Sequence, residues 1–100
     1  MQHAEVPELF TGGVMHDGVV SARLGLRGIP SEAESIMVAR DIQLAELTQG
    51  WYHVAHVSTA RSVELVREAK QRGVRVTCEV APHHILLTHE AVGEFNACAK

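Results

Sequence analysis

The sequence contains no apolar run that approaches the ~18 consecutive residues needed to cross a bilayer. Its N-terminus, MQHAEVPELF, lacks the basic start and the apolar segment of a secretory signal peptide. Only two cysteines are present, Cys78 and Cys98, and they have neither CxxC nor metal-site spacing, so no disulfide framework is indicated. Together these absences predict a cytoplasmic protein that makes no contact with a membrane.

Positive charge and several catalytic motifs are also scarce. Nine basic residues against twelve acidic ones give a formal net charge of −3, and the basic residues are scattered, so the sequence predicts no nucleic-acid partner. It has no HExxH motif and no glycine-rich phosphate loop. A hydrophobic fraction of 46% over 100 residues suits one globular domain, and we treat residues 1–100 as a single domain.

The order of the expected elements predicts an α/β fold with a parallel sheet. Helices are expected at residues 32–49 and 60–72, and strands at residues 51–57 and 74–80. His3 stands where an earlier strand would end. Because strands and helices alternate with short connections, we expect two to three parallel βα units.

Polar start residues and glycine stops mark the ends of both helices. Ser31, with Glu34 three residues later, predicts a capping box for the first helix, and Gly50 marks its end. The signals for the second helix are Ser58 and Thr59 at its start and Gly73 at its end.

Apolar residues at helical spacing predict the buried helix faces. On the first helix they are Ala33, Ile36, Met37, Leu44 and Leu47. On the second helix they are Val63, Val66 and Ala69. Outside these elements we expect a long loop over residues 9–30 with a short helix at 19–24, a strand extension at 85–88, a helical turn at 89–92 and little pattern beyond.

Seven histidines are the unusual feature of the composition, and three groups of them follow expected strands. These are His3, His56 and the pair His83 and His84. The exits of parallel strands share one rim of a sheet, so these side chains are expected to converge on one ion, and imidazole is a preferred zinc ligand. His83 and His84 are adjacent and point in different directions, so at most one is expected to face the site.

The other histidines are interpreted as hydrogen-bonded core or surface residues: His16, His53 and His89. In a strand over residues 51–57, Tyr52, Val54 and His56 would alternate onto one face and His53 onto the other. Only one of the two strand histidines can therefore enter a given pocket.

Two long strings carry a resemblance to a known family. GGVMHDGVVSARLGLRGIPSEAESIMVARDIQLAEL and HVAHVSTARSVELVREAKQRGVRVTCEVAPHHILLT resemble the central part of a type I dihydroorotase, a member of the amidohydrolase superfamily. The resemblance implies a zinc enzyme on a (β/α)8 barrel that interconverts N-carbamoyl-L-aspartate and L-dihydroorotate in pyrimidine synthesis. His3 and His56 are similar to two metal ligands of that family.

The same resemblance implies that much of the enzyme is absent from this sequence. The family's H-x-H pair, its bridging ligand and the aspartate that acts as general base have no counterpart here. A barrel needs about 250 residues, so we expect residues 1–100 to be a central fragment, inactive alone, of a barrel that holds one or two zinc ions. Glu5 or Glu79 would orient the metal ligands, and His83 and His84 would lie on the substrate side.

Three alternatives stay open. Another cyclic amidohydrolase, an allantoinase or dihydropyrimidinase, would share His3 and His56 but tends to carry tyrosine where His84 stands. A non-catalytic dihydroorotase homologue would scaffold aspartate transcarbamoylase. A self-standing α/β module would leave apolar strand edges exposed. The expected partners are a small-molecule substrate and, for a full-length protein, a second copy of itself or aspartate transcarbamoylase.

Overall fold

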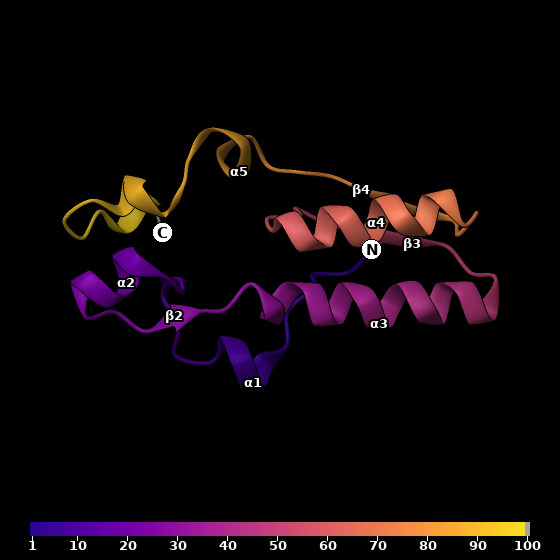
Figure 1. Cartoon of the computed structure of the whole chain (residues 1–100), viewed down its shortest axis with the longest axis horizontal. Helices are drawn as coiled ribbons and strands as arrows, with labels where there is room; N and C mark the ends of the chain where they lie inside the picture. Colours follow the sequence, from indigo (N-terminus) through magenta and orange to yellow (C-terminus); the bar gives the residue numbers. More distant parts are fainter. Residues whose placement is uncertain (100) are drawn as a thin grey trace.

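A computed structural model describes residues 1–99, in which helices and short strands alternate (Figure 1). In chain order the elements are α1 (Pro7–Phe10), β1 (Met15–His16), α2 (Val19–Leu24), β2 (Gly28–Ile29), α3 (Glu32–Thr48), β3 (Tyr52–Val54), α4 (Ala60–Gln71), β4 (Val76–Cys78), α5 (Pro82–Leu86), and the 3₁₀ turns η1 (His89–Val92) and η2 (Ala97–Ala99). No helix among these residues is long and apolar enough to cross a membrane.

The main sheet is parallel, as the alternation of elements predicts. β3 pairs with β4 in the register Tyr52 with Val76 and Val54 with Cys78. On the other edge of β3, Gln2 forms a parallel bridge to Val54. The N-terminal segment, β3 and β4 therefore lie side by side in chain order, and the points where they end share one rim.

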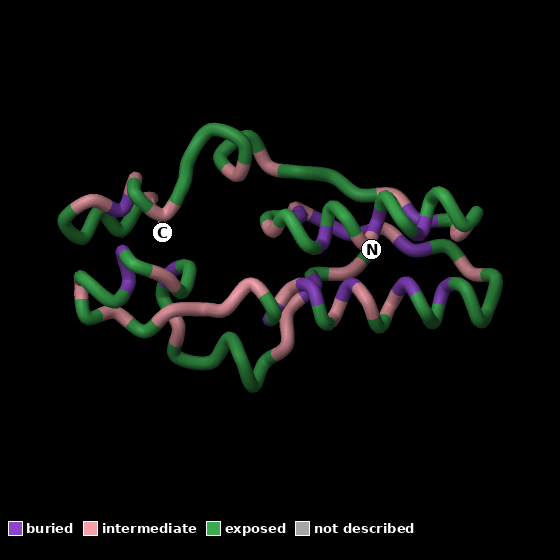
Figure 2. Tube along the Cα trace, viewed as in Figure 1, coloured by how far each residue is buried: buried purple, intermediate pink, exposed green. Residues whose placement is uncertain are grey.

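The helices α3 and α4 run side by side and pack on this sheet (Figure 1). Their contact forms the main core, where purple segments of both helices face each other in Figure 2. Fully buried Val38 of α3, Val54 of β3 and Ala69 of α4 lie at its centre. The fold class is thus mixed α/β with parallel strands. The described residues form two separate two-stranded sheets, so a partial barrel stays a prediction.

Helix positions were well predicted, but some faces were not. Ile36, Leu44 and Leu47 of α3 are 52%, 49% and 80% exposed, contrary to the expected stripe. Apolar residues lie on all sides of this helix, so periodicity alone cannot select its buried face. Ala33 is buried as predicted, and Val38, Ile42 and Ala45 complete the buried face. On α4, Val66 and Ala69 are buried as predicted, whereas Val63 is exposed and Ser62 takes a buried place.

The predicted helix ends are partly correct. Thr59 caps α4 by accepting a hydrogen bond from the amide of Ser62, and Gly73 follows the helix with φ +84°. At the end of α3, Gln49 rather than Gly50 takes the left-handed conformation. The capping box is absent: Ser31 has a helical backbone conformation and makes no side-chain cap bond, and the carboxylate of Glu34 binds a distant loop.

Both main strands are shorter than predicted, and one predicted strand is wrong. β3 ends before His56, which has φ +37°, a value that extended strands do not have. Residues 85–88 do not form a strand. Pro82 at the first helical position starts α5 there, and a short apolar run cannot be assigned to strand or helix from periodicity alone. The helical turn at 89–92 and the short helix at 19–24 are confirmed.

Residues 7–32 leave the main sheet and return to it. The amide of Val6 donates to the carbonyl of Ala33 at 2.8 Å, so the two ends of this excursion meet. Within it, β1 and β2 pair in parallel and α2 connects them. Met15 and Val20 pack with Val92 of η1 in a second, smaller core.

Candidate functional site

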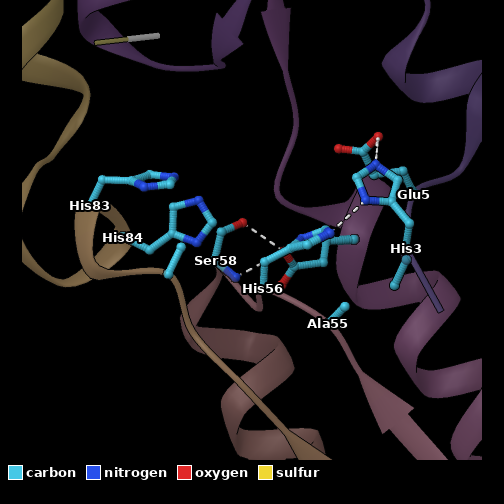
Figure 3. Close-up of a pocket in the computed structure, with 10 residues that line it drawn as sticks. His3, Glu5, Ala55, His56, Ser58, His83 and His84 are labelled. Atoms are coloured by element: carbon cyan, nitrogen blue, oxygen red, sulfur yellow. Dashed lines mark hydrogen bonds and ion pairs between the residues drawn. The ribbon is translucent and has the colours of Figure 1, made fainter. Parts of the chain in front are cut away.

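A pocket of about 440 Å³ lies at the rim where the three extended segments end (Figure 3). We call it the histidine pocket. His3 comes from the N-terminal segment, His56 from the β3–α4 connection, and His83 and His84 from α5. The four histidines singled out from the sequence therefore line one cavity.

His3 and His56 are in direct contact. Nδ1 of His3 lies 2.8 Å from Nε2 of His56, and the ring centroids are 4.5 Å apart. The contact follows from the sheet: because Gln2 bridges Val54, the residues that leave these two segments emerge next to each other. The side chain of His3 is 65% exposed, so the pair is open to a ligand from solvent.

Glu5 fixes the tautomer of His3. A carboxylate oxygen of Glu5 lies 3.0 Å from Nε2 of His3, so this nitrogen is the natural donor to the acceptor-only carboxylate. Nδ1 of His3 then carries a lone pair, which accepts from Nε2–H of His56. A carboxylate behind one imidazole nitrogen, with the other left as a base, is the usual arrangement of a metal-binding histidine.

Of the two predicted orienting carboxylates, Glu79 has a different partner. It lies 3.6 Å from Nε2 of His53, whose Nδ1 is 2.8 Å from the hydroxyl of Thr77. His53 is therefore held between side chains of the β4 region and is not part of the histidine pocket. His53 and His56 face different surroundings, as expected, although His56 lies beyond the end of β3 and strand alternation does not reach it.

His83 and His84 line the opposite wall. Their rings meet edge to face with centroids 4.3 Å apart. The expectation that at most one would face the site is wrong, because α5 separates neighbours by about 100° rather than placing them on opposite strand faces. Nδ1 of His84 is buried and has no hydrogen-bond partner among the described residues, so its hydrogen-bonding capacity is unsatisfied.

His16 and His89 lie outside the histidine pocket. Their rings stack with centroids 5.4 Å apart and line a second cavity beside η1, which shares Ser58, His83 and His84 with the histidine pocket. Their interpretation as core or surface residues rather than ligands stays a prediction.

Glu34 is a pocket residue that the sequence did not reveal as such. One of its oxygens accepts from the amide and hydroxyl of Ser58 at 2.9 and 2.6 Å, and the other from the amide and hydroxyl of Thr59 at 3.1 and 2.9 Å. Burial raises the pKa of Glu34, but the hydrogen bonds from Ser58, Ser62 and Thr59 outweigh burial and place this pKa below its ordinary value. The partners are 24 and 25 residues away, so no local spacing could identify them.

The pair His3 and His56 fits part of a zinc site. Tetrahedral zinc with Zn–N bonds of 2.0–2.1 Å places ligand nitrogens roughly 3.3 Å apart, close to the 2.8 Å between these rings. Residues 1–99 contain no group of three or more histidine, cysteine, aspartate or glutamate side chains arranged to hold a metal. Catalytic zinc usually has three protein ligands, so a zinc site built on this pair would need at least one further ligand.

Comparison with known proteins decides the family. The family described as dihydro-orotase-like matches residues 1–62, which include His3 and His56. The chain belongs to the dihydro-orotase-like family. This confirms the resemblance that the two sequence strings carry.

Curated relatives of this dihydro-orotase-like chain are named dihydroorotase. The relative from Pelotomaculum thermopropionicum is 61% identical and that from Acetivibrio thermocellus 57% identical, each over 100 residues and the whole chain. The chain spans 23% and 24% of these relatives, about a quarter of their length.

Solved structures of a dihydropyrimidinase and a D-hydantoinase contain a similar arrangement of elements. A dihydropyrimidinase from Brevibacillus agri NCHU1002 matches 69% of this chain and 15% of its own with a TM-score of 0.65 and 32% identity. A D-hydantoinase from Bacillus sp. AR9 matches 80% of this chain and 17% of its own with a TM-score of 0.66 and 28% identity. These matches support the parallel α/β arrangement.

Proposed function

We propose that this chain forms the central part of a zinc-dependent dihydroorotase, which interconverts N-carbamoyl-L-aspartate and L-dihydroorotate in pyrimidine synthesis. The observation that carries the proposal is the contact between His3 and His56 at the strand ends of a dihydro-orotase-like chain. The relatives are about four times longer, so residues beyond these 100 would complete a (β/α)8 barrel and supply the remaining metal ligands and the general base.

His3 and His56 would hold zinc through Nδ1 and Nε2, the two nitrogens that face each other. The proton on Nε2 of His56 would then be replaced by zinc, and the neutral ring would carry its proton on Nδ1. Bound zinc supplies a Lewis acid that polarises the ring amide carbonyl. Glu5 keeps the proton of His3 on Nε2 and so keeps Nδ1 available as a ligand. Widening the pair from 2.8 Å to the spacing of a zinc site requires a shift of about half an ångström.

His83 and His84 would lie on the substrate side. They line the pocket together with His3 and His56, and Nδ1 of His84 is buried without a hydrogen-bond partner among the described residues. Imidazole groups donate hydrogen bonds and gain positive charge near neutral pH, which suits the carboxylate of dihydroorotate.

The second candidate is a related ring-opening enzyme such as a dihydropyrimidinase, which the similarity to solved structures of a dihydropyrimidinase and a D-hydantoinase favours. Its substrates lack the carboxylate, so the histidine wall would have no anion to bind. A non-catalytic homologue that scaffolds aspartate transcarbamoylase is disfavoured by the intact pair of His3 and His56.

The test uses the full-length enzyme and measures zinc content together with ring opening of dihydroorotate, dihydrouracil and allantoin. We expect dihydroorotate to be the preferred substrate. His56→Ala should reduce activity by more than the roughly 10- to 100-fold that loss of a supporting residue costs. His53→Ala is the matched control, because this histidine leaves the same strand but faces Thr77.

Three outcomes contradict the proposal: a full-length protein without zinc, activity that survives complete chelation, or equal losses in the two variants. Preference for dihydrouracil would instead support the second candidate.

A further inference from the structure

His56 has an unfavourable backbone conformation. Its φ of +37° lies in the left-handed region, which residues with a Cβ rarely adopt. Such a residue keeps this conformation only when its surroundings hold it on both sides. The conformation matters because it turns the ring of His56 toward His3 at the end of β3.

Backbone hydrogen bonds to the neighbouring segments hold the residues on either side of His56. The amide of Ala55 donates to the carbonyl of Gln2 at 3.2 Å, and the amide of Val57 donates to the carbonyl of Glu79 at 2.9 Å. These bonds fix the residues before and after His56. They leave Ser58 and Thr59, where the chain turns from the sheet into α4, without a sheet partner for their amides.

Glu34 supplies that partner from a different element. Its carboxylate accepts four hydrogen bonds, one amide and one hydroxyl bond from each of Ser58 and Thr59. Thr59 also caps α4 through its bond from the amide of Ser62, which is fully buried. The Glu34 carboxylate therefore joins α3, the loop after His56 and the start of α4.

We propose that Glu34 is a positioning residue for His56: its four accepted bonds hold the Ser58–Thr59 loop so that His56 keeps its left-handed backbone and its contact with His3. This rests on the proposed function, in which His56 is a zinc ligand. Glu34 acts through the loop, because no hydrogen bond joins it to either histidine in the part of the chain described.

A direct role for Glu34 as metal ligand or base is less consistent with the structure. A carboxylate offers about four lone-pair directions, and four donors already occupy them. Ligation or proton transfer would break bonds that hold the loop. Purely general stabilisation, without effect on His56, is the remaining alternative, and the experiment separates it from positioning.

The decisive variant is Glu34→Gln in the full-length protein. Glutamine has the same shape, but its amide group donates, so the donors of one of the two loop residues would meet a second donor. We expect the loop to relax and the competent conformation of His56 to lose population, which weakens zinc binding about 5- to 100-fold in chelator competition. Ser58→Ala, which removes the shortest of the four contacts, should weaken it less, and the double variant should be less than additive.

Val38→Ala is the matched control for stability. Val38 lies on α3, one helical turn after Glu34, and is fully buried in the main core, but its apolar side chain makes no hydrogen bond to the loop. It should lower the melting temperature without changing zinc affinity. If Val38→Ala and Glu34→Gln weaken zinc binding equally, or if Glu34→Gln leaves it unchanged, positioning is refuted.

A metal-free measurement keeps this test distinct from the proposed function. NMR of the apoprotein reports the hydrogen bond between His3 and His56 and the amide exchange of Thr59. Glu34→Gln should lose that imidazole contact and exchange the Thr59 amide faster, while Val38→Ala keeps both. An intact contact in Glu34→Gln overturns the inference even if zinc binds elsewhere, whereas wild-type zinc binding that is indifferent to His56→Ala overturns the proposed function alone.

Discussion

Glycine at position 56 should stabilise the fold relative to alanine, although glycine is normally the weaker residue. Both His56→Gly and His56→Ala remove the imidazole and its contact with His3, so that loss cancels when the two variants are compared. They differ in the backbone. Alanine keeps a Cβ at φ +37°, whereas glycine adopts this conformation without steric cost.

The size of the difference follows from two opposing terms. Relief of the left-handed conformation favours glycine by about 1–2 kcal/mol. The greater freedom of glycine in the unfolded chain opposes this by about 0.4–1 kcal/mol. The net advantage is about 1 kcal/mol, which corresponds to about 4–8 °C in melting temperature for a chain of this size.

Urea denaturation of the metal-free protein measures this difference from the transition midpoints at equal slope. The control is Ala55→Gly, one residue earlier, where the side chain is 8% exposed and φ is not positive. There glycine should cost about 0.5–1 kcal/mol. If glycine is less stable than alanine by the same amount at positions 55 and 56, the left-handed backbone of His56 imposes no strain. Glu34 would then not be needed to hold His56 in this conformation.

Two further predictions concern the hydrogen-bonded carboxylate of Glu34 and the main core. The pKa of Glu34 in the folded protein lies below its ordinary value of 4.5, so the ionised carboxylate contributes stability that is fully present above that pH and is lost as the pH falls through the lower folded value. Glu34→Gln should therefore flatten the dependence of the urea midpoint on pH between neutral pH and about pH 3. An unchanged pH dependence in Glu34→Gln would contradict this prediction. Val54→Ala, at a fully buried site, should cost about 2 kcal/mol. Val19→Ala, where the side chain is 79% exposed, should stay within about 0.5 kcal/mol, and comparable losses in calorimetry would refute this assignment of the core.

Local signals explain why the two long helices were predictable. α4 begins one residue after Thr59, and Gly73 follows its C-cap, Arg72, so both ends depend on residues within a few positions. α2 was also located correctly between glycines 18 and 25. Propensity and capping act over one helical turn, which is the range that a single sequence reveals.

The errors come from contacts between distant residues. Glu34 has the spacing of a capping box with Ser31, but its carboxylate accepts hydrogen bonds from Ser58 and Thr59 instead. β1 and β2 contain two residues each, too few for any alternation to show, and they exist only through their mutual pairing. Exposed Leu47 shows the same limit, since apolar character does not reveal which partner is present.

The contact between His3 and His56 was predictable because it follows from the order of the parallel segments. Parallel neighbouring segments end at one rim, so His3 and His56 were expected to meet without knowledge of any rotamer. The sequence placed His83 and His84 near this rim but predicted that at most one would face the site, because the short helix α5 was not expected. The roles of His3 and His56 as metal ligands and of His83 and His84 as substrate contacts stay predictions.

The hydrogen bond between Val6 and Ala33 closes residues 7–32 into a loop with a common entrance and exit. Lengthening such a closed segment costs little, since the entropy of closure grows only with the logarithm of its length. Insertions and deletions can therefore accumulate there in evolution while the rim that carries His3 and His56 keeps its geometry.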